Sequence, residues 1–407
     1  MDQEWVEKML GKLAQIGCGP QGINRLAYSD ADMHAKEFMI RTMRDNGLTV
    51  RVDSIGNIIG RLEGTVPDAS IVATGSHLDT VPDAGRYDGA LGVVGGLAAI
   101  RRLQSLGPLQ HPVELIIFAA AESSRFGLVM IGSKAMAGMA SRYAWGKAKD
   151  SAGISLAEAL ETKGFGLNDL DKVARVRDSI KAFVELHIEQ GTSLEKTKKQ
   201  IGIIETVAAP TMIKVTINGE TGHTGSIPME ERHDALVSAA TIVLAVQSIA
   251  LDQSPYGTLA TVGQLTTAPG TPNVIPSQVE LWIDLRGVDQ ENIIDTIQEI
   301  KDAVSTITDE QETLAAIDML FSEKPIQMDE YVIRKIETAC LEKNISFRRM
   351  NSAGGHDAMN MAHLAPAGII FIPCKGGISH SPREFADPAD IMAGIDILTQ
   401  TLYELAK

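Results

Sequence analysis

The chain has 407 residues, and its 37 basic and 52 acidic side chains give it a formal net charge of −15. A chain of this length is expected to form two or three domains with a large apolar core, and its 44% hydrophobic and 22% charged residues argue against a disordered or fibrous protein. The acidic balance argues against nucleic acid as the main partner, because phosphate binding requires a basic surface.

The cysteines and the first residues of the chain bear on where the protein works. Cys18, Cys340 and Cys374 are widely spaced and form neither a disulfide framework nor a zinc-finger spacing. Reduced thiols of this kind are typical of cytoplasmic proteins. The N-terminal segment carries charged residues instead of the apolar stretch of a secretory signal, and no run approaches the ~18 apolar residues of a membrane span. We therefore expect a cytoplasmic protein with no membrane partner.

The first half of the chain alternates between helical patterns and apolar runs. Residues 30–46 are predicted to form an amphipathic helix, which Ser29 or Asp30 can cap and Gly47 can end. Residues 89–106, which are rich in Ala, Leu and Gly, are predicted to form a second helix. Short, apolar, β-branched runs indicate buried strands at 70–76, 113–119 and 183–188. This alternation favours an α/β domain with a largely parallel sheet.

The pattern changes after about residue 206. Thr211–Asn218 alternates between apolar and polar side chains, as a half-exposed strand does, and a helix of about twenty residues is predicted from near Glu231. Further elements are expected in the order strand 258–265, strand 279–285, helix 290–308 and strand 313–321. Strand, helix, two strands, helix and strand is the order of a ferredoxin-like α+β sandwich.

The last part of the chain returns to the first pattern, with a helix predicted over 328–343 and a buried strand over 368–373. The simplest arrangement is an α/β fold in which both chain ends build one domain. We predict that residues 1–206 and 326–407 form a mostly parallel-sheet domain. Residues 207–325 are then an inserted, ferredoxin-like α+β domain.

Side chains with metal-binding chemistry occur where the predicted strands end. His77 and Asp79 follow the strand 70–76 and are two residues apart, so they point to the same side of an extended chain. A carboxylate beside an imidazole can set the tautomer of a metal-binding histidine. Asp88 lies in the loop before the helix 89–106 and can aim its carboxylate at the same place.

Three further candidate ligands follow at or beyond later predicted strands: Glu122, His187 and His380. Loops at the carboxyl ends of strands are the usual place for ligands in open α/β sheets. Three imidazoles and two carboxylates that meet there suit two divalent ions, Zn²⁺, Mn²⁺, Co²⁺ or Ni²⁺, with one carboxylate bridging them. A single histidine on an apolar run is more often a packed core residue, but the ordered set of segments favours a metal site.

Eight segments together resemble one known family. They are GSHLDTVPDAGRYDGALGV, ESSRFG, ELHIEQG, GHTGSIPMEERHDAL, NVIP, DLRG, AGGHDAM and ISHSPREF. They run from about residue 75 to 385, so the resemblance covers nearly the whole chain. The chain resembles the dinuclear metallo-amidohydrolases of the aminoacylase/carnosinase superfamily. Within it, HIEQG and ESSRF favour the branch of N-carbamoyl-L-amino-acid hydrolase, allantoate amidohydrolase and β-ureidopropionase over the peptidases.

The resemblance implies a role for each candidate. The implied metal ligands are His77, Asp88, Glu122, His187 and His380. Asp88 would bridge the two ions, and Asp79 would orient His77. His223 would polarise the scissile carbonyl and stabilise the oxyanion. It lies in the inserted domain, which would be a dimerisation (lid) domain, and it would act on the site of the partner subunit in a homodimer. The implied contacts to the ureido and carboxylate ends of the substrate are Gln190, His223, Asn273, Arg286, Gly354 and Gly355.

The residues alone leave three of these roles open. Arg286 ends an apolar strand and can take a carboxylate in a bidentate fork, or it can pair with Asp284 on the same strand face. Asn273 precedes Val-Ile-Pro, where an asparagine is commonly a turn residue. His223 stands near glycines on a flexible loop, where a solvated histidine is the more common case.

One position departs from the family pattern. The family has a pair of glutamates in the third segment, of which the first is the general base and the second binds metal, and this chain has Ala121 and Glu122. A methyl group cannot accept a proton, and general acid–base groups contribute ~10²–10⁴-fold, so slow turnover or none is predicted. Either the residue was replaced to trap a ligand, or the protein is a natural binding-only relative; the intact remaining positions favour replacement. A shifted alignment with Glu114 or Glu185 as the base is a third interpretation.

The sequence therefore predicts a metal-dependent amidohydrolase that cleaves the carbamoyl C–N bond of an N-carbamoyl-L-amino acid to amino acid, ammonia and CO₂. Allantoate and β-ureidopropionate are the alternative ureido substrates, and a dipeptidase or deacylase activity is a weaker alternative. A non-catalytic protein that binds metal and ligand is the alternative from another class. The expected partners are a small ureido compound with a carboxylate and a second copy of the chain.

Overall fold

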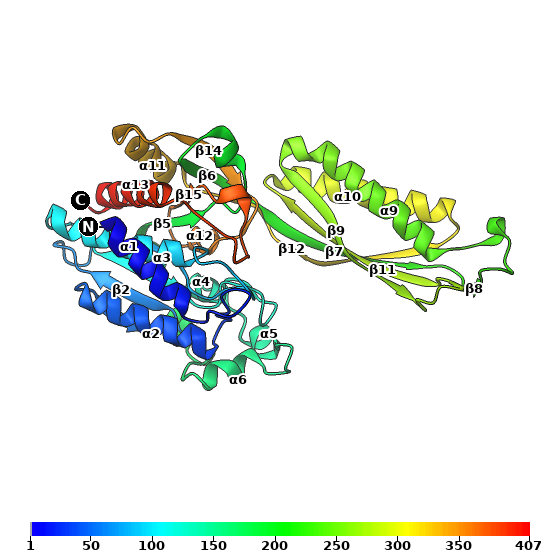
Figure 1. Ribbon diagram of the computed structural model, residues 1–407, viewed down its shortest axis with the longest axis horizontal. Helices are drawn as coiled ribbons and strands as arrows, with labels where there is room; N and C mark the ends of the chain where they lie inside the picture. The colour runs from blue at the N-terminus through cyan, green and yellow to red at the C-terminus, as the bar shows by residue number, and fades with distance from the viewer. Residues whose placement is uncertain (1) are drawn as a thin grey trace. The chain divides into compact units, whose positions relative to one another are not determined.

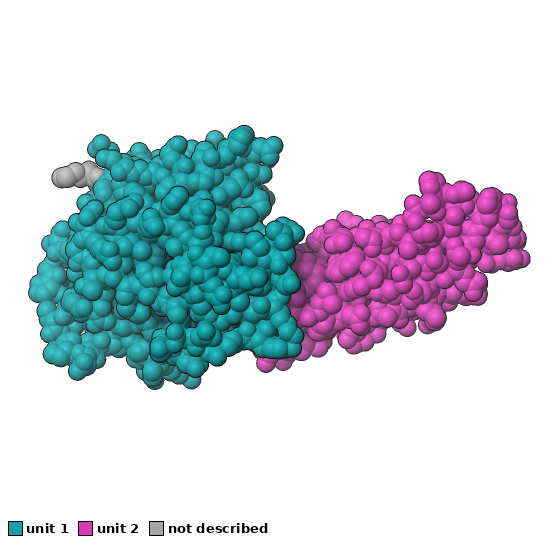
Figure 2. Space-filling model, turned by 90° about the horizontal axis from the view of Figure 1, so that it is seen from below, with its two compact units in different colours: residues 1–205, 328–407 teal, residues 206–327 magenta. Residues whose placement is uncertain are grey.

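The computed structural model describes residues 2–407, which form two compact units (Figure 2). Within the described residues, the first unit comprises 2–205 and Met328–Lys407, and the second comprises Thr206–Gln327. The α/β fold predicted from the sequence is confirmed. The second unit has a hydrophobic core of its own, in which Val215, Leu281 and other side chains of its strands and helices are buried.

The first unit is built on a large mixed sheet. In spatial order, its strands are β1 (Thr49–Val52), β2 (Ile58–Leu62), β4 (Val113–Phe118), β3 (Ile71–His77), β5 (Ile180–Ile188), β15 (Ala367–Ile372), β6 (Ile201–Val207) and β13 (Ile326–Gln327), with β14 (Phe347–Ser352) also paired to β6. The four central strands β4, β3, β5 and β15 are parallel. Antiparallel strands that the sequence analysis did not predict extend the sheet on both sides. The prediction of parallel strands therefore holds for the centre of the sheet.

Helices cover the sheet of the first unit (Figure 1). The longer helices are α1 (Asp2–Gln15), α2 (Asp30–Asp45), α3 (Ala90–Leu106), α11 (Glu330–Glu342) and α13 (Pro388–Ala406). The short ones are α4 (Ile131–Met136), α5 (Arg142–Lys147), α6 (Leu156–Glu161), α7 (Leu170–Val173), α8 (Ser193–Thr197), α12 (Asp357–Met361) and the 3₁₀ turn η3 (Lys375–Gly377). The predicted cap of α2 is present, because the Ser29 side chain accepts the N–H of Asp32.

Helix α3 lies unusually close to the central strands because one of its faces is glycine. A Cβ atom on Gly92 would lie 2.4 Å from the backbone oxygen of Leu186 in β5 and 2.7 Å from the Cβ atom of Ser76 in β3. Such distances are far inside van der Waals contact, so no other residue fits at this position without a shift of the backbone. The close packing brings the start of α3 to the carboxyl ends of β3 and β5.

The second unit has the predicted ferredoxin-like order. Its elements are β7 (Ala209–Asn218), β8 (Gly222–His223), η1 (Met229–Glu231), α9 (Ala235–Gln253), η2 (Ser254–Tyr256), β9 (Thr258–Ala268), β10 (Val274–Ile275), β11 (Gln278–Gly287), α10 (Gln290–Glu310) and β12 (Leu314–Ser322). The antiparallel sheet has the order β12-β7-β11-β9, and both long helices lie on one of its faces (Figure 1). The predicted start of the long helix near Glu231 is wrong, because Asp234 caps the N–H groups of Leu236 and Val237.

Helix α9 is apolar on its inner and outer sides. Among the residues that the structure describes, it is the one helix that is long and apolar enough to cross a membrane by length and composition. Its inner side, with Ile242 and Val246, is buried against the sheet of the second unit, whereas Leu244 and Leu251 are each 65% exposed. Packing on the sheet therefore accounts for only one side of this helix.

Candidate metal centre

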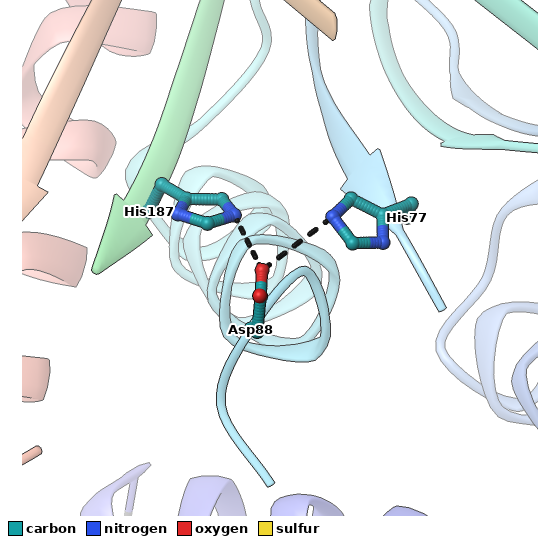
Figure 3. A group of neighbouring side chains, drawn as sticks. All are labelled: His77, Asp88 and His187. Atoms are coloured by element: carbon teal, nitrogen blue, oxygen red, sulfur yellow. Dashed lines mark ion pairs between the residues drawn. The ribbon is translucent and has the colours of Figure 1, made fainter. Parts of the chain in front are cut away.

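The ends of two central strands bring two histidines to one carboxylate. His77 is the last residue of β3, His187 lies in β5, and Asp88 comes just before α3. Figure 3 shows both imidazole rings directed at the Asp88 carboxylate. The Oδ1 atom of Asp88 lies 3.1 Å from Nε2 of His187 and 3.6 Å from Nε2 of His77. These three side chains therefore offer two nitrogens and one oxygen to a single point.

The other oxygen of the same carboxylate faces a second group of ligands. Asp88 Oδ2 lies 2.9 Å from Nε2 of His380, which is 3.5 Å from Oε1 of Glu122. Within each group the ligand atoms lie within 4.8 Å of one another. Imidazole nitrogens and carboxylate oxygens without thiolates suit first-row divalent ions, and a carboxylate shared by two groups can bridge two ions. The donor chemistry of this chain therefore fits a pair of such ions.

Negative charge outweighs burial in setting the protonation of the histidines. Burial alone lowers the pKa of His77, but the carboxylates of Asp79 and Asp88 raise it to about 9. Hydrogen bonds to two carboxylates, first that of Asp88, raise the pKa of His380 to about 10. Burial alone raises the pKa of Asp88, but hydrogen bonds from His187 and His380 hold it well below its usual value. Protons therefore neutralise this site until a cation replaces them.

A third group of buried polar side chains lies beside the first. Glu185, His187 and His356 also come within 4.8 Å of one another. Both oxygens of Glu185 already accept hydrogen bonds, from the Ser76 hydroxyl at 3.2 Å and the Ala358 N–H at 2.8 Å. The His356 ring packs edge-on against His187 with centroids 4.6 Å apart, and burial holds its pKa well below the usual value. These contacts make the group a support for His187.

The carboxylate of Asp79 has different hydrogen-bond partners from the predicted one. Strand β3 ends at His77, and Nδ1 of that ring lies 3.0 Å from the backbone oxygen of Asp79 but 3.8 Å from its carboxylate. The backbone oxygen is therefore the group that sets the tautomer of His77. The carboxylate instead accepts the N–H groups of Ala121 at 3.1 Å and Glu122 at 2.9 Å. Asp79 thus holds the segment that carries a ligand of the second group.

The two other glutamates considered as a general base are already engaged. Glu114 is buried in ion pairs with Arg61 at 3.4 Å and Arg175 at 2.6 Å. Glu185 accepts the two hydrogen bonds described above. A general base must reach the proton that it takes, and neither carboxylate is free to do so. Ala121, by contrast, directly precedes the ligand Glu122 and is only partly buried.

Three of the predicted substrate contacts lie beside the ligands in the first unit. The Gln190 amide donates to Asp88 Oδ2 at 3.0 Å and to the Ser379 hydroxyl at 3.1 Å. A Cβ atom on Gly354 would lie 3.2 Å from Oε1 of Gln190, and Gly355 is the next residue. Gln190 has a left-handed backbone with φ of 57°, a conformation that non-glycine residues adopt mainly where the surroundings impose it.

The other predicted contacts belong to the second unit. His223 in β8 pairs with Val274 in β10, so that it lies beside Asn273, whose backbone oxygen accepts the N–H of Thr224 at 3.3 Å. Arg286 lies in β11 and pairs with Asp284 at 3.1 Å. The structure therefore brings His223 and Asn273 together and places Arg286 on the four-stranded sheet.

Sequence reasoning missed two buried carboxylates near the candidate ligands. Glu384 accepts the N–H groups of Tyr87 and Asp88, and so holds one ligand in place. Asp357 accepts a hydrogen bond from the Ser133 hydroxyl at 2.5 Å. Both acids lie in segments that carry the family resemblance, ISHSPREF and AGGHDAM. The available signal for these two acids was therefore their position close to a predicted ligand or to a glycine pair. Their hydrogen-bond partners could not be predicted, because those partners are far away in sequence.

Comparison with known proteins identifies the family of the chain. The profile of peptidase family M20/M25/M40 matches residues 73–404. The chain is 37% identical over 400 residues to an N-carbamoyl-L-amino acid amidohydrolase from Geobacillus stearothermophilus. This match covers 98% of this chain and 97% of the relative. It is 36% identical over 414 residues to a ureidoglycolate hydrolase from Arabidopsis thaliana, with 100% and 87% covered. An allantoate amidohydrolase from Bacillus subtilis is 35% identical over 398 residues, with 97% and 95% covered.

A solved structure is similar along the whole chain as well. It is an amidase of the hydantoinase/carbamoylase family from Burkholderia multivorans, with a TM-score of 0.90 and 34% identity. The match covers 99% of this chain and 98% of the solved one. Because the family profile and these relatives extend over most of its length, the chain belongs to peptidase family M20/M25/M40 and is similar there to metal-dependent amidohydrolases.

Proposed function

We propose that this protein is built to cleave the carbamoyl C–N bond of an N-carbamoyl-L-amino acid with the help of two divalent ions. The observation that carries the proposal is the sharing of Asp88 between two ligand groups, one with His77 and His187 and one with Glu122 and His380. The reaction consumes one water and yields the amino acid and carbamate, which breaks down to ammonia and CO₂. Divalent ions held by these ligands would supply an activated water and polarise the carbamoyl carbonyl.

The residues of the second unit suit the two ends of such a substrate. The N–H of Gly225 donates to Nδ1 of His223 at 3.1 Å, which leaves the proton of a neutral ring on Nε2. That Nε2–H can donate to the negative charge that develops on the carbonyl oxygen. The guanidinium of Arg286 pairs with Asp284 and keeps 43% of its side chain exposed, which leaves surface for the α-carboxylate of a substrate.

Ala121 then makes this chain a slow or inactive form of the enzyme. A glutamate at this position would take the proton of the attacking water and return it to the leaving nitrogen. Alanine can do neither, whereas the ligands and the contacts to the substrate remain. The second candidate, a protein that binds metal and ligand without turnover, is favoured by this one position.

The substitution Ala121→Glu tests the proposal. We expect it to raise hydrolysis of N-carbamoyl-L-amino acids by roughly 100-fold or more, the lower end of what a general base supplies. Release of amino acid is measured after loading with Zn²⁺, Mn²⁺, Co²⁺ or Ni²⁺ in turn. The matched control is Ala121→Gln, which has nearly the same size but no basic group and is expected to gain nothing.

A panel of substrates separates the alternatives. It includes β-ureidopropionate, allantoate and ureidoglycolate, the last two suggested by the names of relatives, as well as a dipeptide. A higher rate with one of these compounds would change the assigned substrate. An Ala121→Glu protein that is loaded with metal and inert toward the whole panel would contradict the proposed hydrolysis. If ligands still raised its thermal stability, the binding-only function would remain.

We further propose that the second unit is a dimerisation domain and that the protein works as a cytoplasmic homodimer. Strand β9 is an open edge of the four-stranded sheet, and the outward side of α9 exposes Leu244 and Leu251. An open strand edge and an apolar helix face are surfaces that proteins cover by association. A second copy of this chain that pairs along β9 and packs on α9 would cover both surfaces, and His223 would then serve the metal centre of the partner subunit.

A further inference from the structure

Glu384 connects two of the three chain segments that supply the second ligand group, those of Asp88 and His380. It lies four residues after His380 and is 4% exposed. One of its carboxylate oxygens accepts the N–H groups of Tyr87 at 2.7 Å and Asp88 at 3.1 Å. The other accepts the hydroxyl of Ser379 at 2.9 Å. A single buried side chain therefore holds the backbone of Asp88 and the residue next to His380.

A second observation shows how closely the two segments meet. A Cβ atom on Gly85 would lie 2.3 Å from Cβ and 2.5 Å from Oε1 of Glu384. The loop that leads to Asp88 therefore passes directly over the glutamate side chain, and only a glycine leaves room for it. The hydrogen bond between the Tyr87 N–H and Glu384 joins residues that are 297 positions apart in the sequence.

The backbone next to this contact needs support. His380 has a left-handed backbone with φ of 53°, which costs free energy for a non-glycine residue unless the surroundings hold it. Its side chain is 48% exposed, so packing around the ring does little to fix it. The hydrogen bond from Ser379 to Glu384 is a fixed point directly beside it.

We propose that Glu384 is a positioning residue for the second ion, which it serves by holding Asp88 and His380 at the right separation. The inference rests on the proposed metal centre and goes beyond it, because Glu384 is not a metal ligand. Asp88 belongs to both ligand groups, but His380 belongs only to the second. Loss of Glu384 should therefore weaken binding of the ion held by Asp88, Glu122 and His380 more than binding of the ion held by His77, Asp88 and His187. A role in stability alone would affect both ions equally.

The test is a titration of metal-free protein with Co²⁺ that is monitored by calorimetry. Metal analysis after equilibrium dialysis counts the bound ions separately. Wild type is expected to bind two ions. Glu384→Ala is expected to lower the affinity for the second ion by about 10–100-fold, the usual effect of losing an outer partner of a metal ligand. The affinity for the first ion is expected to change much less. Glu384→Gln can accept the same N–H groups and contact Ser379 through its amide, and it is expected to bind the second ion more tightly than Glu384→Ala.

Two further variants keep the test decisive. Glu114→Gln removes another buried carboxylate, which lies in β4 and pairs with Arg61 and Arg175. It is expected to lower the melting temperature while both ions still bind. If Glu384→Ala does not fold, Ser379→Ala removes one side of the contact and is expected to weaken the second ion by a smaller factor.

The outcomes separate this inference from the proposed function. A wild-type chain that binds no Co²⁺ would contradict the metal centre itself. Two ions in wild type, with unchanged second-ion affinity in Glu384→Ala and Ser379→Ala, would overturn the role of Glu384 alone. An equal loss at both ions, or a Glu384→Gln protein as weak as Glu384→Ala, would also overturn it.

Discussion

At the scale of single residues, carboxylates do two different jobs in this site. Asp88 and Glu122 belong to the candidate ligand groups, whereas Asp79 and Glu384 accept backbone N–H groups in the segments that carry them. Each of the latter two accepts two successive N–H groups, so each fixes a loop that would otherwise be free to move. The ligands are therefore held in place by the protein, which lowers the cost of ordering them when a cation binds.

The charge of the site predicts that metal binding depends on pH. His77 and His380, with pKa values raised to about 9 and about 10, are protonated near neutrality in the metal-free protein. A cation binds only the neutral rings, so it must displace these protons. Affinity is therefore expected to rise with pH and to level off once the pH exceeds both values, with a slope of up to about tenfold per pH unit for each proton displaced.

Calorimetry in buffers with different ionisation enthalpies measures the number of protons released. The same titration between about pH 6 and 9 gives the slope of affinity against pH that linkage requires. An affinity that stays constant over this range, with no protons released, would show that the histidines are already neutral or do not bind the ion.

At the scale of helices and strands, close packing of α3 on β3 and β5 places Asp88 between His77 and His187. Substitution of Gly92 by Ala is expected to destabilise the protein by about 1–3 kcal/mol, the usual cost of overpacking, because the new methyl meets Leu186 and Ser76. The free energy of unfolding is measured by urea denaturation. Gly11 in α1 is the matched control, because a Cβ atom there meets nothing within 4 Å.

Gly11→Ala is expected to stabilise the protein by up to about 1 kcal/mol, since alanine is the better helix former. Gly92→Ala is also expected to weaken metal binding, because the start of α3 carries Asp88. A Gly92→Ala protein as stable as wild type, or as stabilised as Gly11→Ala, would show that α3 can move away from the sheet at no cost.

The sequence predicts local features better than contacts between distant segments. The central strands and the order of the ferredoxin-like unit follow from apolar runs and from alternation, which each segment carries by itself. Among the outer antiparallel strands, β1 was missed because it is short and only partly apolar, with the exposed Val52. The backbone partners of Asp79 and Glu384 lie 42 or more positions away, and nothing in a local pattern specifies them.

At the scale of the whole molecule, the proposed dimer depends on the outward face of α9. Leu244→Glu together with Leu251→Glu places two charges on this face and is expected to convert a dimer to monomers, because burying unpaired charges costs several kcal/mol. Light scattering measures the mass, and circular dichroism checks that the unit remains folded. Leu341→Glu is the control, since Leu341 is 67% exposed on α11 of the first unit. A double variant that stays dimeric would place the interface elsewhere.

Mixing two inactive variants tests whether His223 serves the partner subunit. In the Ala121→Glu background, His77→Ala removes a proposed metal ligand and His223→Ala removes the proposed oxyanion donor, so each homodimer is expected to be inactive. When subunits exchange at random, half of the dimers carry one of each, and in these one site has both an intact metal centre and an intact His223. About a quarter of all sites are then complete, and activity is expected to recover to about that level. Recovery in the mixture requires the histidine to act across the dimer, because a His223 that acted within its own subunit would leave every mixed dimer without a complete site.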